Sequence, residues 1–352
     1  MPRRGATNAT ADAPRRATIR DVAGRVGVSL ITVSRALHRP EAVSEGLRAR
    51  IVEAADELGY VPNRAASGLA SGTSRVVPVI LPSLADPACA ALLDGLHEGL
   101  AEAGFQVLPA TTGSRADAEE ARVASALGWA PAGLVLAGVE HPAGVRRRLR
   151  RSGVAAVEVM ELADEPRGLN VGVSPRAVGG AAATFLADRG RGRIAYAGSR
   201  TELGREAAGR IEGFRAALRE RGLPDHLVVR GEGEPSPAEG ARLLGELLRR
   251  FPDADAVFLD DADLAAGAVL EARRRGVAVP GRLAVMGLHD RAIASATSPA
   301  ITSIAIPARE IGATAARLLL RAIREGPPPP CRVDVGFRIV ERESTGPKGG
   351  AS

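Results

Sequence analysis

One short stretch near the N-terminus combines side chains that suit contact with the bases of duplex DNA. Helical spacing over residues 30–37 gathers Val33, Ala36 and Leu37 on one side. The opposite side then carries Leu30, Ile31, Thr32, Ser34 and Arg35. An arginine fork pairs with two acceptors of guanine, and aliphatic side chains contact the thymine methyl group. Because a solvated helix would carry charges instead of Leu30 and Ile31, we favour a DNA-reading helix. A small helical bundle that buries both residues elsewhere is the alternative.

Two further helices are expected to position this one. The first follows Thr18 and has an apolar face of Ile19, Val22, Ala23 and Val26. Gly27 suits a tight turn because glycine adopts positive φ, and Ser29 caps the DNA-reading helix. A third helix after Ser44 has a core face of Leu47, Ile51, Ala54, Ala55 and Leu58. Residues 18–62 are therefore predicted to form a helix-turn-helix headpiece.

The charge distribution agrees with a polyanionic partner for this end of the chain. Residues 1–75 hold twelve arginines against seven acidic residues, whereas the remainder is nearly balanced. The alternative is a short basic tail that is merely solvated.

The two cysteines, Cys89 and Cys331, match no metal spacing, and the histidines form no metal motif. We expect no metal and no cofactor.

The rest of the chain alternates apolar runs with helix-like segments, which predicts parallel sheets covered by helices. The runs lie at residues 76–81, 105–108, 133–137, 155–159, 193–197, 256–259 and 283–286. The length of residues 75–342 favours two such lobes. We expect a disordered arm over 1–17, a hinge over 63–74 and a disordered tail over 343–352. With no membrane-spanning run and no secretory signal, a cytoplasmic location is expected.

Two motifs give the headpiece a specific resemblance. One is I-x-D-V-A-x-x-x-G-V-S-x-x-T-V-S-R, from Ile19 to Arg35, and the other is E-L-G-Y-x-P-N-R-x-A, from Glu57 to Ala66. Residues 18–69 closely resemble the headpiece of the lactose-repressor (LacI) family. The resemblance implies that Leu30, Ile31 and Arg35 read the major groove. It implies phosphate contacts for Thr18, Ser29, Thr32, Ser34 and Asn63.

The resemblance also implies a hinge helix that folds only on DNA. In the family, two such hinges pair in the minor groove, and the residue matching Leu69 wedges into the central base step while Ala66 lies beside it. The alternative is a plain flexible linker. The implied protein is a homodimer on double-stranded DNA with a near-palindromic operator.

The body resembles periplasmic sugar-binding proteins, and within the family the chain is most similar to repressors of gluconate operons. Matching positions make Arg210, His289 and Asp261 candidates for binding a small-molecule effector. Ser83 and Glu158 join them because they lie at predicted strand ends. The family usually has Asn at Asp261, and this carboxylate disfavours an anionic ligand unless Arg210 compensates. A sugar acid, a neutral sugar or polyol, and loss of ligand response all stay open.

The sequence therefore predicts a DNA-binding transcriptional regulator of carbohydrate or sugar-acid catabolism, with repression as the usual family behaviour. A solute-binding protein for sugar uptake is the alternative that the body alone would allow. An enzyme is not expected, because no G-x-G-x-x-G after a first strand, no P-loop and no nucleophile elbow is present.

Overall fold

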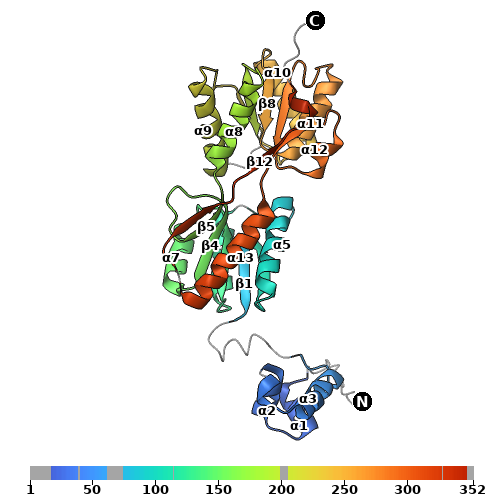
Figure 1. Cartoon of the computed structure of the whole chain (residues 1–352), viewed down its shortest axis with the longest axis vertical. Coiled ribbons are helices and arrows are strands. Elements are labelled where there is room, and N and C mark those ends of the chain that lie inside the picture. Colours follow the sequence, from blue (N-terminus) through green and yellow to red (C-terminus); the bar gives the residue numbers. More distant parts are fainter. Residues whose placement is uncertain are drawn as a thin grey trace, which may run out of the picture. The chain divides into compact units, whose positions relative to one another are not determined.

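The computed structural model describes residues 17–38, 40–61, 74–113, 115–198, 205–326 and 328–346. The chain divides into two compact units, residues 1–74 and 75–352 (Figure 1). The predicted arm, except for Ala17, and the predicted hinge, except for Ser74, lie outside the described residues. None of the described helices is long and apolar enough to cross a membrane.

The N-terminal unit is a three-helix domain. It consists of α1 (Ile19–Val26), α2 (Leu30–His38), a 3₁₀ turn (Pro40–Ala42) and α3 (Glu45–Glu57). Its core is small and aliphatic, with Val22 and Ala23 from α1, Val33 from α2 and Ile51 from α3. Gly27 has φ of 77° and closes α1 with a bond from its N–H to the carbonyl of Ala23 at 2.9 Å. This tight turn sets the entry into α2.

The second unit contains two lobes, each built on a six-stranded sheet. Sheet A, in the first lobe, is entirely parallel, in the order β11 (Cys331–Asp334), β5 (Leu169–Val173), β4 (Ala155–Glu161), β3 (Gly133–Ala137), β1 (Val76–Leu81) and β2 (Gln106–Thr111). Sheet B, in the second lobe, has the order β12 (Arg338–Val340), β10 (Thr302–Ala305), β9 (Ala284–Leu288), β8 (Ala256–Leu259), β6 (Ile194–Gly198) and β7 (Val228–Arg230). Only β12 is antiparallel to its neighbour among these pairs of described strands. The predicted two-lobed α/β body is confirmed.

Helices cover both faces of each sheet. In the first lobe, α5 (Pro87–Ala101) and α13 (Ala308–Glu325) cover one face, and α6 (Ala116–Leu127) and α7 (Ala143–Ser152) cover the other. In the second lobe, α8 (Pro175–Asp188) and α9 (Arg205–Glu220) lie opposite α10 (Pro237–Arg250), α11 (Ala262–Arg274) and α12 (Ala292–Ala296). The chain passes between the lobes after β5, after β10 and after β11 (Figure 1).

Three helix pairs approach closely because each helix of the pair carries a glycine at the crossing. A Cβ atom there would lie 1.9–2.2 Å from a carbonyl oxygen of the partner helix. Real side chains do not tolerate such contacts, so only glycine permits this spacing. The reciprocal glycines are Gly95 and Gly312 for α5 and α13, Gly179 and Gly213 for α8 and α9, and Gly240 and Gly267 for α10 and α11.

The predicted tail boundary at residue 342 is too early. Residues Glu343–Thr345 form a 3₁₀ turn that packs against β9 and β10 of sheet B. Ser344 and Thr345 are fully buried, and the hydroxyl of Ser344 accepts a hydrogen bond from the N–H of Thr302 at 2.9 Å. The second lobe therefore includes residues up to at least 346, because these hydroxyls complete the hydrogen bonding of β10.

Candidate functional site

The first candidate site is the outer face of α2 in the headpiece. Val33 and Ala36 are buried, as the spacing predicted, whereas Ile31 is 64% exposed and Leu30 is 41% exposed. Arg35 is exposed on the same helix and has no ion pair among the described residues. Because the core is complete without Leu30 and Ile31, the structure excludes their burial inside the headpiece. Two aliphatic side chains and a guanidinium are thus presented outward.

Local hydrogen bonds fix the starts of α1 and α2. The hydroxyl of Ser29 accepts from the N–H of Thr32 at 3.1 Å and lies 2.9 Å from the hydroxyl of Thr32, so Ser29 caps α2. At α1 the hydrogen bonds are those of a capping box between Thr18 and Asp21, rather than those of a threonine cap alone. The carboxylate of Asp21 accepts from both the N–H and the hydroxyl of Thr18 at 2.8 and 2.7 Å. Thr18, Ser29 and Thr32 are held in place at helix N-termini, where phosphate contacts are favoured.

Three of the predicted DNA-binding residues cannot be placed. Asn63, Ala66 and Leu69 lie outside the described residues, so their roles stay predictions.

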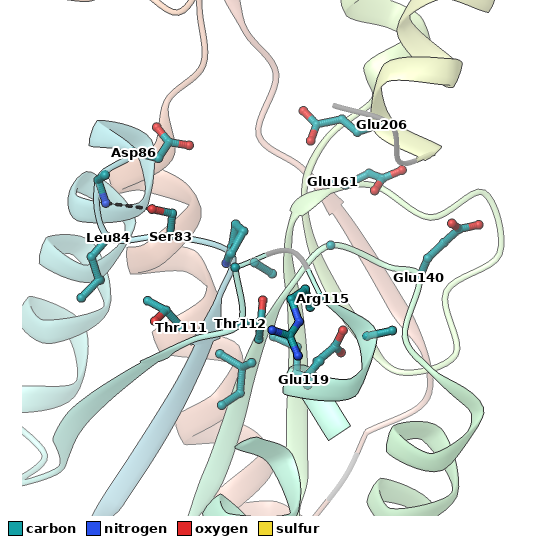
Figure 2. A pocket seen from close by; sticks show the side chains of 18 of the residues that line it. Ser83, Leu84, Asp86, Thr111, Thr112, Arg115, Glu119, Glu140, Glu161 and Glu206 are labelled. Carbon is teal, nitrogen blue, oxygen red and sulfur yellow. Dashed lines mark hydrogen bonds between the residues drawn. The ribbon is translucent and has the colours of Figure 1, made fainter. Parts of the chain in front are cut away.

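The second candidate site is a cleft between the two lobes, with a volume of about 1640 Å³. It lies at the carboxyl ends of the parallel strands, where open α/β sheets place ligands. Figure 2 shows Ser83, Asp86, Thr112 and Glu161 on the first lobe and Glu206, at the start of α9, across from them. The lining is rich in acidic side chains, which suits a ligand with polar groups better than a wholly apolar one.

Three of the five predicted effector residues line this cleft. Ser83 follows β1, and its hydroxyl accepts from the N–H of Ala85 at 3.1 Å (Figure 2). Asp261 caps α11 by accepting from the N–H of Asp263 at 2.7 Å. His289 follows β9 and has a φ of 64°, which turns the chain sharply at the strand end.

The other two lie behind the lining. Arg210 is 1% exposed, and its Nη2 donates to Oε1 of Glu206, one turn away in α9, at 2.8 Å. Among the described residues, Glu206 and not Arg210 lines the cleft. Glu158 lies 3.7 Å from Nε2 of His141, whose Nδ1 is 2.6 Å from Glu119. Arg210 and Glu158 therefore do not line the cleft themselves. Each contacts a residue that does, Glu206 for Arg210 and His141 for Glu158.

Arg291 has a central position in the second lobe's part of the cleft. Its guanidinium lies 3.1 Å from Asp261, 2.8 Å from Asp263 and 3.5 Å from Asp86. Asp86 belongs to the first lobe, where it caps α5. We call these four residues the Arg291 cluster. The cluster joins both lobes and places a cation between three carboxylates.

Burial governs the charge of His289. Desolvation, and secondly the guanidinium of Arg210, lower the pKa of His289 below its usual value. At neutral pH this imidazole is therefore uncharged. Burial also raises the pKa of Glu158, against the opposing field of His141.

Comparisons with known proteins place this arrangement in a family. Residues 18–63 match the family model of bacterial regulatory proteins of the lacI family, and residues 183–345 match the periplasmic binding protein-like domain. The HTH-type transcriptional regulator GntR of Pseudomonas aeruginosa is 41% identical over 332 residues, which is 94% of this chain and 96% of that protein. The chain belongs to the lacI family of bacterial regulatory proteins. It is a DNA-binding transcriptional regulator, and the alternative of a solute-binding protein is set aside.

Solved structures of transcriptional regulators agree with this placement. A family member from Silicibacter pomeroyi has a TM-score of 0.86 and 30% identity, with 94% of this chain and 99% of that chain covered. The regulator CelR in complex with cellobiose has a TM-score of 0.68 and 29% identity, with 94% and 100% covered.

Reasoning from the sequence missed Arg291, Asp86 and Asp263 in this lacI-family chain. A weak signal was present, since Arg291 follows a predicted strand and Asp86 precedes Pro87, a common first residue of a helix. Neither signal reveals that the two meet, because they lie on different lobes.

The lowered pKa of His289 predicts a pH-dependent loss of stability. Between the ordinary pKa of about 6.5 and the lower folded value, the unfolded chain takes up a proton that the folded chain does not. The stability that the uncharged His289 contributes to the folded state is therefore fully present above about pH 6.5 and is lost as the pH falls. His289→Asn, which tolerates the positive φ, should lose less thermal stability than the wild type between pH 7.5 and 5.5. His97→Gln, on the exposed side of α5, is the control. Parallel pH profiles for the wild type and His289→Asn would contradict the assignment.

Proposed function

We propose that this lacI-family regulator binds a near-palindromic operator as a homodimer, with α2 in the major groove. The observation that carries the proposal is the exposed face of Leu30, Ile31 and Arg35 on a helix whose opposite face is fully packed. Thr18, Ser29, Thr32 and Ser34 are assigned to phosphate contacts around it. Two-fold symmetry of the dimer requires two half-sites of matching symmetry.

The hinge residues complete this proposal. Asn63 holds a phosphate, Leu69 wedges into the central base step and Ala66 lies beside it in the minor groove. Because the operator is chromosomal DNA, the protein acts in the cytoplasm. Its role requires no catalytic step, no cofactor and no metal.

We further propose that a small polyhydroxylated effector binds in the cleft between the lobes and controls operator binding. The sugar ligand of the related CelR complex supports this class of effector. A ligand that contacts both lobes changes the angle between them and shifts the population away from the DNA-binding state. It must bind the two states with different affinities, since equal affinity shifts nothing. Repression relieved by the effector follows the usual behaviour of the family.

Selection of duplexes from a random pool tests the operator proposal. Purified protein should enrich inverted repeats, and affinity for the enriched duplex should fall steeply with salt. A screen of sugars and sugar acids by thermal shift then finds the effector, because a ligand of the folded state raises its stability. Failure to prefer any inverted repeat over random duplex at modest ionic strength would refute the operator proposal.

A further inference from the structure

The described lining of the cleft has a large surplus of negative charge. Nine carboxylate side chains and three guanidinium groups line it. His289 adds no positive charge at neutral pH, because burial lowers its pKa. A ligand that carries a carboxylate would therefore enter a field that opposes it.

Three guanidinium groups are too few to balance nine carboxylates, and two of the three are already held in ion pairs. Arg291 is held by three carboxylates of the Arg291 cluster, and Arg115 pairs with Asp117. Arg146 is the third, and its positive charge is close enough to Glu158 to lower the pKa of that carboxyl, against the larger effect of burial, which raises it. Arg210, which the sequence suggested as the compensating cation, is buried against Glu206. The cation beside Asp261 is Arg291. Its single positive charge is smaller than the summed negative charge of its three carboxylate partners.

The same arrangement suits hydroxyl groups. A sugar hydroxyl both donates and accepts, and the Arg291 cluster offers guanidinium donors next to carboxylate acceptors. The carboxylate acceptors come from both lobes, since Asp86 of the first lobe and Asp261 of the second lobe both pair with the guanidinium of Arg291. On the first lobe, His141 is 5% exposed and lines the cleft, and its Nε2 has no hydrogen-bond partner among the described residues. This nitrogen is itself buried and lies 3.7 Å from a carboxylate oxygen of Glu158, so the hydroxyl-binding groups are those of the Arg291 cluster.

We propose that the cleft binds an uncharged polyhydroxylated ligand, with adjacent hydroxyl groups on the Arg291 cluster, and discriminates against the corresponding sugar acid. This inference rests on the proposed effector function and specifies its ligand class. Asp261 and Asp263 accept hydrogen bonds from the ligand hydroxyls, and Arg291 donates to their oxygens. The carboxylates that accept from a hydroxyl repel a ligand carboxylate.

Matched pairs of ligands, in which one hydroxymethyl group of the alcohol is replaced by a carboxylate in the acid, test the proposal. D-Glucitol and D-gluconate share a six-carbon chain and four hydroxyl configurations, and differ in a terminal hydroxymethyl group against a carboxylate. D-Mannitol with D-mannonate and galactitol with D-galactonate extend the series to other configurations. Isothermal titration of the full-length protein should show the alcohol binding about ten-fold or more tightly than its acid in every pair that binds.

A charge variant separates repulsion from shape. Asp261→Asn keeps the cap of α11, because asparagine is also a good N-cap, and removes one carboxylate from the Arg291 cluster. The dissociation constant of the acid divided by that of its alcohol should fall by about three- to ten-fold in this variant, because the acid binds more tightly. Asp253→Asn is the matched control, because Asp253 also pairs with an arginine, Arg193 at 2.9 Å, but does not line the cleft. The control should leave the ratio unchanged.

Two results would overturn the inference. One is an acid that binds as tightly as its alcohol or more tightly, and the other is the absence of binding by all three alcohols. The first result leaves the proposed function intact if the acid also releases the protein from its selected operator. Failure of operator selection would instead refute the proposed function itself, whatever the ligand data show.

Discussion

Arg35→Ala is expected to lower affinity for the selected operator by about 10- to 100-fold for each half-site that loses its contact. A bidentate contact between arginine and guanine contributes roughly 1–3 kcal/mol of discrimination between bases. Arg35 is exposed on α2, so its removal leaves the headpiece core of Val22, Val33 and Ile51 untouched. Affinity for random duplex should fall much less, because that binding depends on phosphate contacts. Fluorescence anisotropy at one fixed salt concentration measures both affinities.

A second arginine in the headpiece provides the control for charge. Arg25 lies on α1 and forms an ion pair with Glu57 of α3 at 2.9 Å. Both side chains are exposed. Arg25→Ala removes the same charge and should change the preference for the operator over random duplex by less than about three-fold. Equal losses on operator and random duplex for Arg35→Ala would show that Arg35 binds phosphate and reads no base.

The headpiece could be predicted in detail because its determinants are local. The spacing of Val22, Ala23, Val33 and Ala36, the turn at Gly27 and the cap at Ser29 all lie within a few residues of one another. Short helices with a shared aliphatic core leave few arrangements for such a pattern. The same locality made the exposed face of α2 visible in the sequence.

The body was predicted as a class, but several of its strands were not. The seven apolar runs all became strands, whereas five strands were not among the predicted runs: β5 (Leu169–Val173), β7 (Val228–Arg230), β10 (Thr302–Ala305), β11 (Cys331–Asp334) and β12 (Arg338–Val340). In β5 the buried Asn170 interrupts the apolar pattern, because its amide donates to the carbonyl of Glu161 at 2.8 Å. Strands β11 and β12 are short edge strands, and their partners lie far away in the chain.

The effector cleft was the least predictable part, because its contacts join distant segments. Asp86 and Arg291 meet across the two lobes, and no local pattern specifies such a pair. Arg210 illustrates a different problem. Its position matches the family's effector-contacting arginine, but the match does not show which side chains surround it. Here the side chain is fully buried and bonded to Glu206, so its chemistry reaches the cleft through that carboxylate.

Gly179→Ala is expected to destabilise the second lobe by about 1–3 kcal/mol, a lowering of the melting temperature by several degrees. A Cβ on Gly179 would lie 1.9 Å from the carbonyl oxygen of Arg210 in α9. This oxygen belongs to the backbone, so the two helices must separate to relieve the contact. The separation would also displace Arg210 and, with it, Glu206 at the cleft. Thermal unfolding monitored by circular dichroism measures the loss.

The neighbouring glycine is a matched control. A Cβ on Gly180 has its nearest contact at 3.6 Å, from the carbonyl oxygen of Gly213, which is an ordinary van der Waals distance. Gly180→Ala therefore gains helix propensity without a clash and should be neutral or stabilising by up to about 1 kcal/mol. Equal destabilisation by both substitutions would contradict the close-approach explanation.

The reciprocal glycine distinguishes a clash that separates the helices from one that is absorbed locally. A Cβ on Gly213 would lie 1.9 Å from the carbonyl oxygen of Arg176 in α8, on the same interface. If each substitution pushes α8 and α9 apart, the separation caused by one relieves part of the contact made by the other. The double variant Gly179→Ala/Gly213→Ala should then lose less stability than the sum of the two single losses. Strict additivity would mean that each backbone yields independently, and the spacing of α8 and α9 would not be set jointly by the two glycines.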